Sequence, residues 1–324
     1  MTLRCSLCGS RAFTRVRYSR LSLCRRHYAE FFERRVKNTV ERYRLFKNVK
    51  RLLVCVSGGK DSVAMLYALK PHAEKRNVEL LGLTIDLGIG EYSKRSVEAA
   101  VEAFKNNDVD YLLVDLSAEH GFDIDTVAEN IKKLKMPKGI CSYCGSVKRY
   151  IFNKAALDNG CDAVATGHNL DDLLSFTLTS MASGQVELLI KLQPKNMGVD
   201  KLVTRIRPLA TLTNRETLLY VISIGASYVD LECPYSPGRS IQKTIVEKLS
   251  EIEYEHPGFK LALYKSLLRV LRKAEVKPGP LTRCEKCGMP SSTRICSFCR
   301  LKSLMTKKNT DEELTEAQVT ARRV

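Results

Sequence analysis

Long apolar runs are missing from this chain of 324 residues. No stretch approaches the roughly 20 apolar residues that a membrane-spanning helix needs, so no membrane partner is expected. The N-terminus, with Arg4, Cys5 and Cys8 close together, also lacks the apolar segment of a secretory signal. We therefore expect a cytoplasmic protein, in which thiols stay reduced.

Acidic residues are scarce, most of all near the start of the chain. The formal net charge is +17. Residues 1–51 are rich in Lys and Arg and contain only the acids Glu30, Glu33 and Glu41. Such a basic segment favours a polyanionic partner, with nucleic acid ahead of a membrane surface. A solvated face that only aids solubility is the alternative.

The 12 cysteines are better explained as metal or catalytic ligands than as disulfides. Two sets of four ligands have the spacing of tetrahedral zinc sites with no open position, which are structural rather than catalytic. The first set is Cys5, Cys8, Cys24 and His27, and the second is Cys284, Cys287, Cys296 and Cys299. The sequence therefore predicts a zinc module near each end of the chain.

A third set, Cys141, Cys144 and Cys233, allows more than one function. Two of these thiols could act as a persulfide carrier and a resolving thiol, without metal. Alternatively, all three could hold a 4Fe–4S cluster and leave one iron open. A third reading makes Cys233 a buried loop thiol and the Cys-x2-Cys pair incidental. The sequence places Cys141 and Cys144 in a loop that enters a helix near Ser146.

The segment Ser57-Gly58-Gly59-Lys60-Asp61-Ser62 lies between an apolar strand at 52–56 and a helix at 62–69. A glycine-rich turn at this place lets backbone N–H groups converge on an anion at the helix N-terminus. The pattern is not the GxxxxGK[ST] loop of ordinary P-loop NTPases. It resembles the PP-loop, SGGxDS, of ATP pyrophosphatases, which cleave ATP to AMP and pyrophosphate. A solvated Gly-Gly turn is the alternative.

Strands and helices alternate after residue 51, which predicts an α/β fold: a doubly wound, Rossmann-like parallel sheet covered on both faces. Ligands then bind beyond the C-terminal ends of the strands. Expected strands lie at 52–56, 80–85, 111–116 and 162–166. Expected helices lie at 28–46, 62–69, 92–106, 146–158, 213–224 and 240–250, with one or two more within 254–275.

Two further segments belong to the predicted ligand edge. The loop after the strand at 162–166 contains Gly167, which allows close backbone approach, and the pair Asp171 and Asp172. Paired carboxylates suit a magnesium ion that bridges phosphates, although an Asp pair is also a common helix N-cap. Lys148 could reach the ATP phosphates from the cysteine side, or could simply be a solvated lysine.

Taken together and in order, the motifs resemble the TtuA-type tRNA 2-thiouridine synthetases, a family of PP-loop ATP pyrophosphatases. The resemblance covers nearly the whole chain and includes both zinc modules, SGGKDS, CSYCG at 141–145, TGHNLDD at 166–172 and ECPY at 232–235. Lysidine synthetases and TtcA-type cytidine thiolases share SGGKDS but lack the paired zinc modules.

The resemblance implies a set of site residues. It makes Cys141, Cys144 and Cys233 ligands of a 4Fe–4S cluster with one open iron, and makes Lys148 and Asp172 essential beside the nucleotide. The implied ATP contacts are Ser57, Gly58, Gly59, Lys60, Asp61, Ser62, Ile85, Lys148 and Gly167, and we expect the backbone of Cys55 at the strand end to touch ATP as well. The side chains of Cys55 and Cys161 are expected to be core thiols.

The resemblance also implies the reaction. The uridine C2 oxygen would attack the α-phosphorus of ATP–Mg²⁺ and release pyrophosphate; sulfur held by the cluster would then displace AMP. The expected target is the T-loop uridine or ribothymidine of tRNA, with the wobble uridine as the alternative. The implied partners are tRNA, a ubiquitin-like thiocarboxylated sulfur donor or sulfide, and a second copy in a homodimer. A zinc-containing RNA-binding or redox-sensing protein is the non-enzyme alternative.

The expected division of the chain follows the same motifs. It consists of an N-terminal zinc finger at 1–30, a basic linker helix at 31–50, the PP-loop catalytic domain at 51–240, a helical region at 241–280, a C-terminal zinc finger at 281–305 and a polar tail at 306–324.

Overall fold

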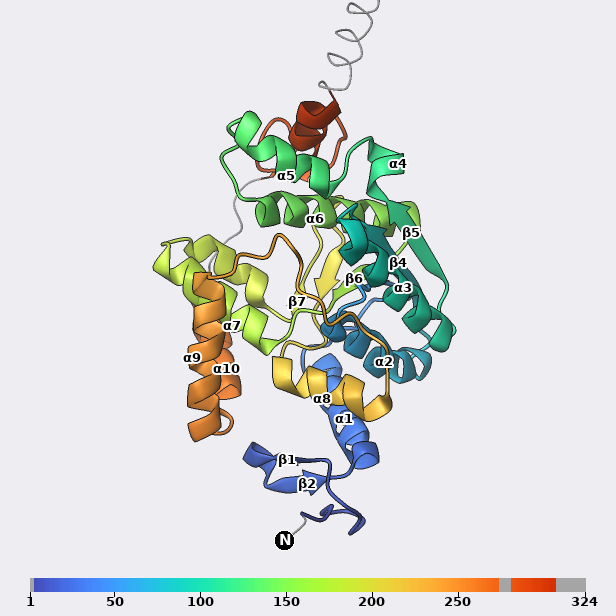
Figure 1. Ribbon diagram of the computed structural model, residues 1–324, viewed down its shortest axis with the longest axis vertical. Helices are drawn as coiled ribbons and strands as arrows, with labels where there is room; N and C mark the ends of the chain where they lie inside the picture. Colours follow the sequence, from blue (N-terminus) through green and yellow to red (C-terminus); the bar gives the residue numbers. More distant parts are fainter. Residues whose placement is uncertain (1–2, 274–280, 307–324) are drawn as a thin grey trace, which may run out of the picture.

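The computed structural model describes residues 3–273 and 281–306 (Figure 1). Residues 307–324 of the expected polar tail therefore lie outside the described part. The centre is a six-stranded sheet with the order β5-β4-β3-β6-β8-β7. Its parallel strands are β3 (Arg51–Cys55), β4 (Glu79–Asp86), β5 (Tyr111–Asp115), β6 (Ala163–Thr166) and β8 (Thr204–Ile206). The predicted parallel sheet is confirmed, whereas the short parallel strand β8 and the antiparallel edge strand β7 (Lys195–Asn196) were not predicted.

The side chains of β3 explain why both faces of the sheet are covered. Leu52 and Val54 belong to one apolar core, whereas Leu53 and Cys55 belong to the other, because successive strand residues point to opposite faces. The first face carries α1 (Arg25–Arg42), α2 (Lys60–Glu74), α3 (Gly90–Asn106) and α8 (Asn214–Ile224). The second carries α4 (Leu116–His120), α5 (Ile124–Lys133) and α6 (Ile140–Asp158).

A third apolar core lies beside the sheet, among helices that follow the β6 and β8 strands. It joins α7 (Leu170–Ala182) and the 3₁₀ segment Val186–Leu192 to the helical pair α9 (Ile241–Glu255) and α10 (Phe259–Lys273). Figure 1 shows α9 and α10 side by side, next to α7 and on the opposite side of the sheet from α3.

The two cysteine-rich modules dock at opposite ends of the molecule (Figure 1). The N-terminal module contains β1 (Thr14–Val16) and β2 (Leu21–Leu23) and leads directly into α1. The C-terminal module contains β9 (Thr282–Arg283) and β10 (Pro290–Ser291). Its Phe298 is buried and stacks on Tyr150 of α6, with ring centroids 3.8 Å apart and planes 4° from parallel. The C-terminal module thus packs on the helix that carries Cys141 and Cys144.

Helix boundaries differ from the expectations in ways that matter for the site. The helix expected from about Ser146 begins at Ile140, after Gly139, whose extended backbone (φ −70°, ψ 159°) forms the N-cap. Cys141 and Cys144 therefore lie on the first two turns of α6 rather than in a loop, and Lys148 lies on the third turn. In the described residues, no helix is long and apolar enough to cross a membrane.

Most other helices are longer than expected. α2 continues to Glu74 through Pro71, α9 continues to Glu255, and α1 begins at Arg25 but ends at Arg42. In the described residues 254–273, α10 follows the end of α9, and residues 274 and 275 of the expected helical region lie outside the described part. The helices α4, α5 and α7 were not predicted.

Candidate active site

The PP-loop lies between the end of β3 and the start of α2 and is closed by its own hydroxyl groups. Ser62 Oγ accepts a hydrogen bond from the Ser57 N–H (3.0 Å) and donates one to the Gly59 carbonyl (2.9 Å). Gly59 caps α2 with an extended backbone and no side-chain cap. The N–H groups of the first turn of α2 therefore have no side-chain partner, which is the arrangement that binds phosphate.

Two glycines are required by close approach of other backbone. Gly58 has φ +75°, and a Cβ there would lie 2.2 Å from the Ser96 carbonyl oxygen. A Cβ on Gly167 would lie 2.9 Å from the nitrogen of Ser62. The close approach expected of Gly167 is thus made to the PP-loop itself, which brings the end of β6 against the phosphate-binding turn.

The residues Asp61, Asn169, Asp171 and Asp172 form what we call the carboxylate side of the cleft. The Asn169 side chain accepts hydrogen bonds from the N–H groups of Asp171 (2.9 Å) and Asp172 (3.1 Å), and the Asn169 N–H donates to Asp172 Oδ2 (3.0 Å). This capping box starts α7. Asn169 Nδ2 (3.1 Å) and Thr217 Oγ1 (2.5 Å) both donate to Asp61 Oδ1. The PP-loop and the starts of α7 and α8 are therefore joined by hydrogen bonds.

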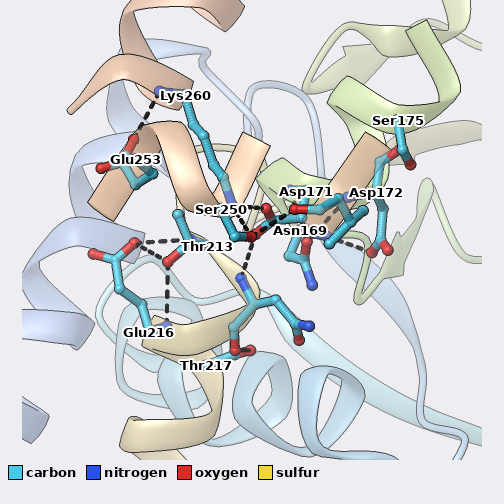
Figure 2. A network of polar contacts seen from close by, with 12 residues as sticks. Asn169, Asp171, Asp172, Ser175, Thr213, Glu216, Thr217, Ser250, Glu253 and Lys260 are labelled. Atoms are coloured by element: carbon cyan, nitrogen blue, oxygen red, sulfur yellow. Dashed lines mark hydrogen bonds and ion pairs between the residues drawn. The ribbon is translucent and has the colours of Figure 1, made fainter. Parts of the chain in front are cut away.

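Asp171 does not form a magnesium-binding pair with Asp172, and that expectation is wrong. The Asp171 carboxylate is buried and forms an ion pair with Lys260 of α10, while its Oδ2 accepts the Asn214 N–H (2.7 Å) (Figure 2). Lys260 Nζ also donates to Ser250 Oγ (2.8 Å). A buried carboxylate needs such partners. The Asp171 side chain therefore attaches the α9–α10 pair to the site, whereas Asp172 is exposed.

Asp172 has an unusual electrostatic environment for a residue on the surface of the cleft. The surrounding protein raises its pKa to about 7, and the nearby Asp61 and Asp171 add to this rise. The Asn169 N–H and the Lys60 ammonium act in the opposite direction. A carboxylate that is costly to ionise alone suits a place where a cation completes its surroundings.

We call Cys141, Cys144 and Cys233 the thiol side of the cleft. The segment after α8 carries Cys233 across the PP-loop, because the Val229 N–H donates to the Gly58 carbonyl (2.9 Å). The Cys141 thiol donates to the Tyr235 carbonyl (3.5 Å), and the Tyr235 hydroxyl donates to Asp125 of α5 (2.7 Å). Cysteines that are far apart in sequence are thereby brought to one edge of the phosphate-binding turn.

The charges around Cys144 and the spacing of the three thiols indicate which metal centre they could form. Burial raises the pKa of Cys144, and the charges of Cys233 and Cys141 raise it further, whereas Lys148 lowers it. In the described residues, the three ligand atoms do not all lie within 4.8 Å of one another, as those of the two zinc-type sets do. One tetrahedral zinc ion needs sulfurs only ~3.8 Å apart. An all-thiol set with wider spacing fits ligands on different irons of a cluster.

Arg205, Arg207 and Lys148 make this cleft positive. Burial lowers the pKa of Arg205. Burial also lowers the pKa of His168 to about 4, and Arg207, Arg205 and Lys148 add to this fall, so the imidazole is neutral near pH 7. Arg207 is only 7% exposed, and its Nη1 donates to the Gln193 carbonyl (2.7 Å). No ion pair of the described residues includes Lys148 or either arginine. Both arginines were missed from the sequence, because Arg205 lies in a strand of only three residues and Arg207 follows that strand.

The remaining predicted site residues lie close to this cleft. Ile85 is near the C-terminal end of β4, beside β3. Cys55 ends β3 and is buried, and burial raises its pKa, as it also does for Cys161. The side chains of Cys55 and Cys161 are therefore core thiols.

The two cysteine-rich modules bring their predicted ligands together. The ligand atoms of Cys5, Cys8, Cys24 and His27 lie within 4.8 Å of one another, and so do those of the C-terminal four cysteines. The Cys8–Cys24 and Cys287–Cys296 sulfur pairs are both 3.8 Å apart. This equals the edge of a tetrahedron with ~2.3 Å zinc–sulfur bonds. Both donor sets fit zinc.

Comparison with known proteins gives consistent matches over nearly the whole chain. Residues 28–233 match the PP-loop domain family, and residues 4–29 match the N-terminal LIM domain of 2-thiouridine synthetase TtuA. The tRNA-5-methyluridine(54) 2-sulfurtransferase of Pyrococcus horikoshii is 38% identical over 96% of this chain and 99% of its own. That of Thermus thermophilus is 34% identical over 98% and 97%.

A solved structure has the same fold. The U34-tRNA thiolase NcsA from Methanococcus maripaludis, with its [4Fe-4S] cluster, superposes with a TM-score of 0.78 at 27% identity. The match covers 94% of this chain and 96% of that one.

Proposed function

This chain belongs to the TtuA family of PP-loop tRNA 2-thiouridine synthetases, and on that premise we propose that it thiolates C2 of the uridine or 5-methyluridine at position 54 of tRNA. The relatives named for position 54 are 32–38% identical over at least 94% of this chain. The structure named for U34 is 27% identical. This difference favours the T-loop over the wobble base.

One observation carries the assignment more than any other. The hydrogen bond from Val229 to Gly58 places the Cys233 segment on the PP-loop, and the bond from Cys141 to Tyr235 draws the start of α6 to the same segment. These contacts support a shared site for the PP-loop and the three thiols. A catalytically silent RNA-binding protein would not need this juxtaposition.

Each of the site residues has a distinct role in the proposed reaction. The free N–H groups at the start of α2, with Lys60, bind the β- and γ-phosphates and stabilise the departing pyrophosphate. The uridine C2 oxygen attacks the α-phosphorus as the bond to pyrophosphate breaks. Asp172 would hold the magnesium ion that accompanies ATP, and Lys148 would stabilise the charge of the reacting phosphate from the thiol side. Sulfur then attacks C2, and AMP leaves with the former C2 oxygen.

Cys141, Cys144 and Cys233 would hold a 4Fe–4S cluster. When bound by three thiolates, such a cluster leaves one iron able to bind an exogenous sulfur ligand. The positive cleft formed by Lys148, Arg205 and Arg207 keeps the phosphates and the departing AMP in place. The proposal also includes two structural zinc ions and a ubiquitin-like sulfur donor. It further includes a homodimer and a cytoplasmic location.

The test is an anaerobic reaction of the cluster-reconstituted protein with unmodified tRNA, ATP, magnesium and sulfide. Thiolated nucleosides are then located by mass spectrometry of nuclease fragments. A 2-thio product at position 54 is expected. A product at position 34 would retain the chemistry and change the target, whereas no thiolated base with the cluster intact would refute the function.

A Cys144→Ser variant separates cluster chemistry from a persulfide mechanism. We expect it to bind substantially less iron after reconstitution and to lose thiolation, while ATP binding remains. The matched control is Cys161→Ser, on a buried thiol away from the cleft. Iron-free wild-type protein with full activity would favour the persulfide.

A further inference from the structure

A cavity lies between the N-terminal module, α8 and the α9–α10 pair, apart from the thiol side of the active site. Its volume is about 420 Å³, and its walls come from residues 14–18, the start of α8, the end of α9 and the start of α10. Lys60 of the PP-loop lines its inner end. Cys141, Cys144, Cys233, Lys148 and Asp172 do not line it.

A ligand in this cavity would meet arginines that have no carboxylate partner, whereas the carboxylates of the cavity are bound within the protein. Arg15 and Arg215 line it, are exposed, and have no carboxylate partner in the described part of the chain. Its three carboxylates are all engaged within the protein: Asp171 by Lys260, Glu216 by Arg35 (2.7 Å), and Glu253 by the N–H groups of Gly258 and Lys260 (2.6 and 2.8 Å). The cavity therefore presents positive charge to whatever enters.

Tyr254 provides a flat aromatic surface at the wall of this cavity. Its ring is 66% exposed, and the Arg17 guanidinium lies 4.5 Å from the ring centroid. Arg17 also donates a hydrogen bond to the Tyr254 carbonyl. The ring is thus held in place by an arginine from the N-terminal module. Leu218, Leu219 and Val246 add apolar surface to the same cavity.

We propose that this cavity binds a nucleotide of the RNA substrate other than the one that is modified, with its base stacked on Tyr254 and its phosphate beside Arg215. A held aromatic ring among unpaired arginines is the combination that binds unstacked bases. The net charge of +17 favours RNA over an acidic peptide of similar size. This inference deepens the proposed function and rests on tRNA as the substrate.

The test measures equilibrium binding of unmodified tRNA to the full, zinc-loaded chain without ATP, at several salt concentrations. Tyr254→Ala is expected to weaken binding about 10-fold, and Tyr254→Phe to bind as the wild type does, because stacking needs the ring and not the hydroxyl. Arg215→Ala is expected to reduce the slope of log affinity against log salt by about one, the value for one lost phosphate contact. Lys94→Ala, an exposed cation on α3, is the matched control and is expected to leave affinity and slope unchanged.

Three outcomes would overturn the inference. Unchanged tRNA affinity in both Tyr254→Ala and Arg215→Ala would do so, as would equal weakening by Lys94→Ala. The third is a loss of ATP affinity or of sulfur-donor affinity in Tyr254→Ala without a loss for tRNA, which would assign the cavity to a free nucleotide or to a protein tail. The binding assay contains no ATP and therefore involves no thiolation. Failure of the wild type to thiolate tRNA would refute the proposed function without affecting the result of the binding assay.

Discussion

The two sides of the active-site cleft are built by different means. On the carboxylate side, Asp61, Asp171 and Asp172 each have protein partners, and the buried Lys260 secures Asp171 from a distant helix. On the thiol side, Cys141 has one long contact to a carbonyl, and Cys144 has Lys148. The phosphate-binding half is therefore organised by more contacts within the protein than the thiol half is.

The largest effect should come from breaking the buried ion pair of the carboxylate side. Lys260→Met leaves the Asp171 carboxylate without its cation, and the free energy of unfolding should fall by about 3–5 kcal/mol. Urea unfolding followed by circular dichroism measures this. The double variant Lys260→Met with Asp171→Asn should recover part of the loss, because the amide oxygen can still accept the Asn214 N–H. Wild-type stability in the single variant would show that the pair does not organise this side.

Asp172→Asn, on the same side, should lower the thiolation rate without lowering the stability of the protein. The amide can still accept the Asn169 N–H bond, so the free energy of unfolding should stay close to that of the wild type. Loss of the charge should lower the thiolation rate about 10²–10³-fold, or about 2.7–4 kcal/mol in the barrier. Single-turnover assays with saturating ATP measure the rate. A rate close to the wild type would remove Asp172 from the mechanism.

Tyr235→Phe tests whether the thiol side depends on metal for its order. The change removes the 2.7 Å hydrogen bond to Asp125 that holds the Cys233 segment, which is worth about 1 kcal/mol. We expect lower iron occupancy after reconstitution. Thr217→Val is the matched control on the carboxylate side: it removes the bond to Asp61 and should leave iron content unchanged. Equal iron loss in both variants would contradict the division into two sides.

The smallest effect concerns His168, whose Nδ1 lies 3.0 Å from Thr166 Oγ1 at the end of β6. Its folded-state pKa is lowered from 6.5 to about 4. Burial, which disfavours the charged ring, is the main cause, and the positive charges of Arg207 and Arg205 add to it. The unfolded chain therefore binds a proton at a higher pH than the folded chain. The stability that depends on the neutral ring is present above pH 6.5 and is lost as the pH falls toward 4. His168→Asn should lose less stability between pH 7 and pH 5 than the wild type does.

Local patterns were enough to predict the sheet, the PP-loop and the two cysteine-rich modules. Each depends on residues close together in sequence, such as the apolar run at 52–56 or the Cys284–Cys287 spacing. The start of α6 was predicted too late because Gly139 was not recognised as its N-cap. The small strands β7 and β8 gave no comparable signal, since each has at most three residues.

The partners within the site could not be predicted because they are distant in sequence. Asp171 and Asp172 are adjacent and look equivalent, yet burial beside Lys260 removes one of them from the cleft. Nothing near Lys260 in the sequence indicates that it meets Asp171. The Tyr254–Arg17 pair likewise forms only after the N-terminal module docks beside α9.

The stacking of Phe298 on Tyr150 has a consequence for biosynthesis. A ribosome makes Cys141 and Cys144 well before it makes the C-terminal module, so α6 leaves the ribosome without the surface that later covers it. Its outer face stays exposed until the module has been translated and has folded. A nascent chain arrested before residue 281 should therefore expose this face of α6 to proteolysis.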